Sequence, residues 1–74
     1  MRSLKNQLGE VYELILNYNG LDIEARVFRM GNTWYFHNYF YNDVRCFDCY
    51  EYQTLQDVLN TCKQYQVQET FRLN

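Results

Sequence analysis

"YNGLD", residues 18–22, decides the fold, because it is the strongest turn signal in the chain. Asn19 and Gly20 both tolerate a positive φ, which the two central residues of a type I′ hairpin turn require. We therefore expect two antiparallel strands, over 10–18 and 21–29, whose paired residues sort into two faces. The expected partners are Tyr18 with Leu21, Leu16 with Ile23, Leu14 with Ala25 and Tyr12 with Val27 on one face, and Asn17 with Asp22, Ile15 with Glu24 and Glu13 with Arg26 on the other.

Two further turns extend this hairpin into a meander. A Gly-Asn pair at 31–32 leads into the aromatic stretch "TWYFHNYFY" at 33–41. An Asn-Asp pair at 42–43 then leads into "VRCFDCYEY" at 44–52. Both pairs are typical of tight turns. The sequence therefore predicts four strands that follow one another as antiparallel neighbours.

The segment after the meander has helical periodicity. "TLQDVLNTCKQY" at 54–65 repeats apolar residues at helical spacing, with Thr54 as N-cap and Asp57 in an aspartate variant of the capping box. We expect an α+β fold in a single domain, 1–74: a four-stranded antiparallel meander sheet with one C-terminal helix packed on one face. The alternating tail at 67–73 could add a short fifth strand.

A helical alternative for the N-terminal part stays open. Residues 3–18 also separate into two sides on a helical wheel, with Ser3 as the cap and Gly20 as the left-handed residue after the helix. The order would then be α-β-β-β-α, which resembles double-stranded-RNA-binding domains in topology. Those domains carry basic residues at the start of their last helix, where this chain has Asp57. The partners that the Asn-Gly turn predicts favour the hairpin.

Composition and charge exclude several classes of protein. The 74 residues suffice for one small domain, 47% of them are hydrophobic and 19% aromatic, and eight are tyrosines. The net charge is −2 without any basic stripe, so the electrostatic footprint of a nucleic-acid binder is missing. No run approaches the ~20 apolar residues of a membrane span. Three cysteines, an odd number, fit reduced thiols in a cytoplasmic protein.

The aromatic stretch raises the question of what covers the second face of the sheet. Carrying the register forward pairs Val27 with Phe36 on the face that the helix covers. It also pairs Ile23 with Phe40 there. One helix covers one face, so the other should present a contiguous aromatic patch, and such patches mark interaction sites. Cover by residues 1–9, by the tail, by a second copy or by a foreign protein stays open. The candidate contact residues are Glu24, Arg26, Phe28, Tyr35, His37, Tyr39, Tyr41, Asp48 and Tyr50.

The cysteines and the histidine predict no catalytic, cofactor-binding or metal-binding site. Cys46 and Cys49 form a CxxC, but on a regular strand they point to opposite faces and cannot share one metal. The motif also lies upstream of the helix, away from the helix N-terminus where redox motifs of this kind sit. His37 is expected opposite Asp48, and no nucleophile is placed to complete a catalytic site. We therefore expect a protein that is not an enzyme.

The expected function is non-enzymatic protein binding by steric occlusion through the aromatic face. In size and composition, and in no motif, the chain resembles the inhibitors that bacteriophages encode against host machinery, anti-CRISPR proteins among them. The resemblance implies a protein partner, such as a host defence or nucleic-acid-processing complex, and action in the host cytoplasm. Self-association into a homodimer would extend the core of a small monomer. The alternative is a nucleic-acid-binding regulatory domain that stacks bases on the same rings.

Overall fold

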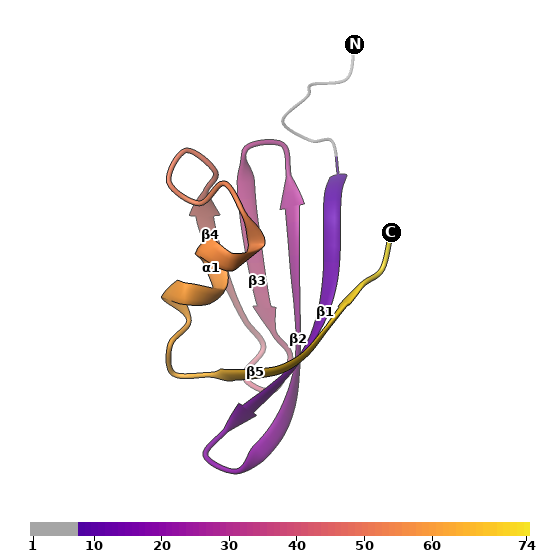
Figure 1. The fold of residues 1–74 in the computed structure, drawn as a ribbon, viewed down its shortest axis with the longest axis vertical. Helices are drawn as coiled ribbons and strands as arrows, with labels where there is room; N and C mark the ends of the chain where they lie inside the picture. The colour runs from indigo at the N-terminus through magenta and orange to yellow at the C-terminus, as the bar shows by residue number, and fades with distance from the viewer. Residues whose placement is uncertain (1–7) are drawn as a thin grey trace.

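A computed structural model describes residues 8–74 as a five-stranded antiparallel sheet with one short helix on one face (Figure 1). The strands lie in the order β4-β3-β2-β1-β5, so the meander of the first four is extended at its β1 edge by the last. This is an α+β fold, as expected, with five strands instead of four. The elements are β1 (Leu8–Tyr18), β2 (Leu21–Met30), β3 (Thr33–Asn38), β4 (Asp43–Asp48), α1 (Leu55–Thr61) and β5 (Gln66–Arg72).

The first two turns form where the sequence predicts them. Asn19 and Gly20 have φ values of 52° and 84°, the left-handed backbone of a type I′ turn. Each expected partner across β1 and β2 is confirmed, on both faces of the hairpin. At the next turn Gly31 carries the positive φ, 58°, and β3 pairs directly with β2 after it. The helical alternative for 3–18 is wrong over 8–18, which form β1, and its first residues lie outside the described ones.

The hydrophobic core lies between α1 and the inner face of the sheet, meaning the strand side chains that point toward α1. Val27 lies opposite Phe36 on this face, as the register predicts. Val58 of α1 is fully buried in the same cluster. The buried residues of the core are Leu14, Leu16, Ile23, Ala25, Val27, Trp34, Phe36, Val58, Cys62 and Tyr65.

Helix α1 begins at the predicted capping box and ends early. Asp57 N donates to the Thr54 hydroxyl at 3.2 Å, and Thr54 N donates to Asp57 Oδ2 at 3.1 Å. The helix ends at Thr61 because Cys62 leaves helical backbone, with φ −95° and ψ 52°. The chain then turns so that Tyr65 enters the core. No helix within residues 8–74 is long and apolar enough to cross a membrane.

The tail forms β5 at the edge of the sheet and leaves the second face uncovered. It pairs antiparallel with β1, which makes the expected four-stranded sheet five-stranded and places α1 before the last strand. A bulge interrupts the pairing, since Ile15 faces Glu69 but the next residue, Leu16, faces Val67. Because the bulge shifts the alternation, Val67 packs against the core while Glu69 faces the other side of the sheet.

The third turn differs from the prediction, because β3 ends at Asn38. The Asn38 side chain is buried, and its Oδ1 accepts hydrogen bonds from the backbone N–H groups of Phe40 (3.0 Å) and Tyr41 (3.3 Å). Its Nδ2 donates to the Tyr65 hydroxyl at 2.8 Å. The turn is therefore a four-residue loop, 39–42, closed by Asn42 at φ 51°, instead of a two-residue turn at 42–43.

Two predicted pairs fail for this reason. Phe40 lies in the loop with 58% of its surface exposed, so the pair with Ile23 does not form. His37 lies opposite Val44 instead of Asp48, and Asp48 lies opposite Thr33. The partners on β4 are displaced by four residues from the predicted ones. An even displacement keeps every side chain on its predicted face.

Candidate functional site

The outer face of the sheet, meaning the strand side chains that point away from α1, is uncovered within the described part of the chain. Figure 1 shows α1 on one side of the sheet only. Across the opposite side, neighbouring strands place four side chains next to one another without an intervening charge. We call this set the apolar row: Val11, Phe28, Tyr35 and Cys46, from β1, β2, β3 and β4 respectively.

Aromatic side chains on the outer face pack against each other while staying open to solvent. The Phe28 and Tyr35 rings stack with centroids 5.2 Å apart and an interplanar angle of 13°. The His37 and Tyr39 rings lie 4.4 Å apart at 57°. Tyr39 keeps 40% of its surface exposed, and the other three rings are half-buried. Paired rings of this kind form a contact surface whose side chains lose little freedom on binding.

The next row toward the first hairpin turn carries a neutralised charge. Arg26 Nη2 lies 3.1 Å from Glu13 Oε2, and the Arg26 guanidinium lies 5.9 Å from the centroid of the Tyr39 ring. His37 follows on β3, and its buried Nε2 has no hydrogen-bond partner among the described residues. Arg26 is thus already committed to a carboxylate and a ring of its own chain.

Exposed carboxylates lie at both ends of the outer face. Glu24 and Glu69 stand on either side of Ile15, on the strands that flank β1. Asp22 follows toward the first turn, where its Oδ1 accepts a 2.6 Å hydrogen bond from Gln68. Asp48 lies at the opposite end, where β4 passes the second turn. We call this set the acidic rim: Asp22, Glu24, Asp48 and Glu69, all exposed.

The other basic residues of the strands belong to the inner side. Arg29, Arg45 and Arg72 each lie opposite an inner-face residue of the neighbouring strand. Arg26 is therefore the one basic residue at an outer-face position in the described strands. The outer face is acidic as a result, although the net charge of the whole chain is only −2.

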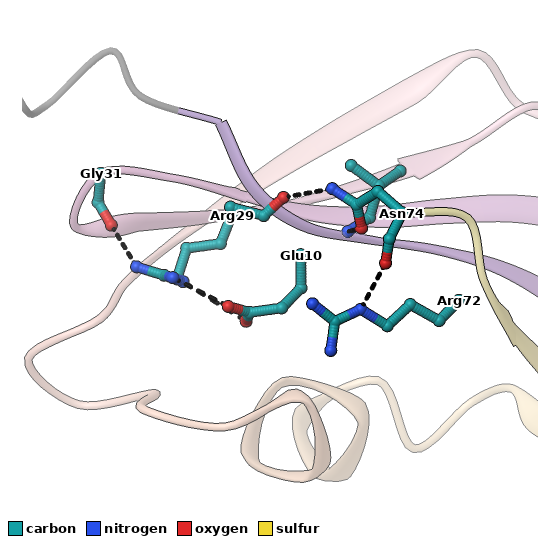
Figure 2. Close-up of polar contacts among 7 residues, drawn as sticks. Glu10, Arg29, Gly31, Arg72 and Asn74 are labelled. Carbon is teal, nitrogen blue, oxygen red and sulfur yellow. Dashed lines mark hydrogen bonds and ion pairs between the residues drawn. The ribbon is translucent and has the colours of Figure 1, made fainter.

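Arg29 is held in a polar cluster beside the second turn (Figure 2). Its Nη2 donates to Glu10 Oε1 at 2.8 Å, and its Nη1 donates to the Gly31 carbonyl at 3.0 Å. The hydrogen bond from Arg29 holds the pKa of Glu10 below its ordinary 4.5, and the same bond raises the pKa of Arg29. We interpret the cluster as a structural link between β1 and β2.

One asparagine fastens the end of β5 to β1, as Figure 2 also shows. Asn74 Oδ1 accepts a hydrogen bond from Val11 N at 3.0 Å, and Asn74 Nδ2 donates to the Gly9 carbonyl at 2.8 Å. The Asn74 carbonyl accepts a bond from Arg72 Nε at 2.8 Å. The side-chain amide thus replaces a backbone peptide group and continues the ladder beyond β5. This fixes the edge of the outer face next to the apolar row.

A hollow of about 710 Å³ opens on the outer face at the second-turn end. The Tyr35 ring and the Asp48 carboxylate both border it. Asp48 Oδ1 accepts a 2.9 Å hydrogen bond from Tyr50 N, which fixes the turn that carries the Tyr50 ring. The hollow is lined by Met30, Asn32, Thr33, Tyr35, Cys46, Asp48 and Tyr50.

The structure brings most of the predicted contact residues together on the outer face, with two exceptions, Tyr41 and Tyr50. Tyr41 is not on the outer face: its ring packs edge-on against Tyr18, 5.8 Å away, beside the core. Tyr50 lies in the turn after β4 with 89% of its surface exposed. The residues that do share the outer face are Glu24, Arg26, Phe28, Tyr35, His37, Tyr39 and Asp48.

The three cysteines lie in three different environments. Cys46 is exposed in the apolar row, Cys49 is half-buried against the core, and Cys62 is buried under α1. Burial raises the pKa of the Cys49 thiol and that of the Cys62 thiol. Within residues 8–74, no three His, Cys, Asp or Glu side chains gather where they could hold a metal ion.

Some outer-face residues were not among the predicted contact residues. Phe71 lies opposite Glu13, with 49% of its surface exposed, and Leu73 N donates to the Val11 carbonyl at 2.8 Å. The alternation of the tail predicts a strand, but the bulge that turns Phe71 outward leaves no signal in the sequence. Val11 pairs with Phe28, as the predicted hairpin register implies, but it was not named as a contact residue.

Comparison with protein-family models, with curated proteins and with solved structures finds no match for this chain.

Proposed function

We propose that this chain is a non-enzymatic protein-binding module and that the outer face is its contact surface. One observation carries the proposal: a row of apolar and aromatic side chains runs across four strands, and no described element covers it. Burying apolar area of this kind contributes about 25 cal/mol per Å², so covering the exposed face with a partner would stabilise the complex. Aromatic rings supported by neighbouring rings are the side chains that dominate protein interfaces.

The mode of action that we propose is steric occlusion. A sheet face can block a site on another protein without any chemistry of its own. A phage-type inhibitor of a host defence or nucleic-acid-processing complex, acting in the host cytoplasm, would need this property. The small size and the tyrosine-rich composition support that assignment by analogy. A homodimer formed through the same face would instead bury the apolar row between two copies.

Nucleic-acid binding through the same rings is the weaker proposal. The stacked pair of Phe28 and Tyr35 offers a platform on which a base could stack. Phosphate groups on either side of that base would meet the acidic rim, and Arg26 is already paired with Glu13. Single-strand binders surround their stacking rings with basic residues, whereas the described strands place Arg26 alone of the basic residues on the outer face.

A pull-down with two matched variants tests the proposed function. Tyr39→Ala removes a ring that packs on His37 of the outer face, whereas Phe40→Ala removes the next ring of the same loop, which packs on Tyr41. From candidate host lysates, wild type and Phe40→Ala should retain the same protein, and Tyr39→Ala should retain about tenfold less if it loses about 1.4 kcal/mol of interface energy. Equal retention by Tyr39→Ala would place the contact elsewhere on the molecule.

A further inference from the structure

We propose that the partner of the outer face is a basic protein surface, in which arginine or lysine side chains flank an apolar centre. This inference rests on the proposed function, because it names the chemistry of the partner that the same face binds. It commits to one class of occupant. A second copy of the chain, an acidic protein and a nucleic acid are the outcomes that would contradict it.

The charges on the outer face favour a basic partner. Glu24 and Glu69 lie at one end of the outer face and Asp48 at the other, with the apolar row between them. Arg26, the one arginine that the described strands place on this face, is neutralised by Glu13 at 3.1 Å. A complementary surface therefore has an apolar centre and positive charges on both sides of it.

The hollow between Tyr35 and Tyr50 also favours a basic partner. Two aromatic rings and the Asp48 carboxylate line a space of about 710 Å³ that is open to solvent. Asp48 uses one oxygen to accept the Tyr50 N–H, which leaves lone pairs on the carboxylate for a further donor. A guanidinium group can stack its face on an aromatic ring while its N–H groups donate, within the guanidinium plane, to a carboxylate. The hollow therefore suits an arginine side chain.

The same charges disfavour the other occupants. In a symmetric dimer both copies present the same patch, so each acidic rim would meet a face on which the described strands place Arg26 as the only basic residue. Like charges brought together at an interface raise its free energy. A nucleic acid would bring phosphates toward the same carboxylates. Only a basic protein surface gains from the apolar row and from the acidic rim together.

Titration of the 74-residue chain with two blocked six-residue peptides tests the inference. One peptide alternates arginine with leucine, and its matched control alternates glutamate with leucine. In proton–nitrogen correlation spectra the arginine peptide should shift the amides of the apolar row, and the glutamate peptide should not. The shifts should weaken when the salt concentration rises from about 0.02 M to about 0.5 M, because exposed charges are screened.

A pair of charge variants tests which carboxylates matter. Glu24→Gln removes a charge from the acidic rim, whereas Asp43→Asn removes one from an inner-face position of β4. Glu24→Gln should weaken binding of the arginine peptide about two- to fivefold, as expected for one exposed ion pair at low salt. Asp43→Asn should leave the affinity unchanged. Equal weakening by both variants would show that only the net charge matters.

The remaining outcomes separate the inference from the proposed function. If both peptides shift the apolar row equally at all salt concentrations, the face binds proteins but charge does not select them. If neither peptide shifts it, the inference is wrong, and the pull-down with Tyr39→Ala still decides the proposed function. If oligothymidylate binds it more tightly than the arginine peptide, both the inference and the proposed function are wrong. A second copy would be identified as the occupant by two observations together. Sedimentation equilibrium would show a dimer at every salt concentration, and the amide signals of the apolar row would broaden as that dimer forms.

Discussion

Asn38 sets the length of the aromatic strand with a single buried side chain. Its amide oxygen accepts hydrogen bonds from two backbone N–H groups of the following loop, and its amide nitrogen donates a hydrogen bond to the Tyr65 hydroxyl. The side chain therefore completes the turn and connects it to the chain beyond α1. A buried polar group is stable only when its hydrogen bonds are made, and here both ends of the amide are used.

We predict that Asn38→Ala destabilises the fold by roughly 2–3 kcal/mol, because it leaves the buried Tyr65 hydroxyl and two N–H groups of the loop without their hydrogen bonds. Asn42→Gly is the control, since glycine accepts the φ of 51° at that position and should change stability little. Urea unfolding followed by circular dichroism measures both. A loss below about 0.5 kcal/mol for Asn38→Ala would mean that water replaces the amide.

The sequence allowed the face of most residues to be predicted, but not their partners across the third turn. Alternation assigns His37 and Asp48 to the same face whichever residues they oppose. Their pairing depends on where β3 stops, and that depends on the hydrogen bonds of the Asn38 side chain, one of which joins it to Tyr65, 27 positions away. A contact so distant in sequence is invisible to local turn signals. Tyr41 was misplaced for the same reason.

At the scale of elements, a helix of only seven residues completes the core. Isolated helices of this length are unstable in water, so α1 depends on its cap and on its packing. Val58 is fully buried, whereas Leu59, the next residue, is only half-buried against the core. The apolar stripe of the segment predicts the helix, but it does not predict which of Val58 and Leu59 is the more deeply buried.

We predict that Val58→Ala costs more stability than Leu59→Ala, although it removes one carbon fewer. Val58→Ala should cost about 2 kcal/mol, since two buried methyl groups are lost and a cavity remains. Leu59→Ala should cost about 1 kcal/mol, because part of that side chain already contacts water. Denaturant unfolding of both variants gives the comparison. The reverse order would show that Leu59 is the residue that anchors α1.

At the scale of the whole molecule, the sheet has one protected and one open face. Helix α1 and the segment after it fill the inner face with a continuous core. The five strands then leave the apolar row and the acidic rim together on the outer face. This division follows from the number of elements in the described chain, since one helix can cover one face. It was predictable from the sequence, as were Asp22, Glu24 and Asp48 on the outer face, whereas the place of Glu69 in the acidic rim required the register of β5.

Cys46 provides a built-in probe of whether the outer face is open in the free protein. Its thiol lies exposed in the apolar row, whereas Cys62 is buried and burial raises its pKa. Alkylation needs an accessible thiolate, so a buried thiol reacts only when the fold opens. We predict that iodoacetamide modifies Cys46 first and Cys49 more slowly. Cys62 should react at least about 100-fold more slowly than Cys46. Mass spectrometry of the intact and digested chain follows the three reactions.

The control for this order is the same reaction in denaturant, where the three cysteines should react at similar rates because burial no longer distinguishes them. Dilution separates two causes of slow labelling at Cys46. If Cys46 becomes reactive on dilution, a second copy covers the outer face in solution. If Cys46 stays as protected as Cys62 at every protein concentration, part of the same chain covers the apolar row. In either case the surface that we propose for a basic partner is already occupied, and the contact must lie elsewhere.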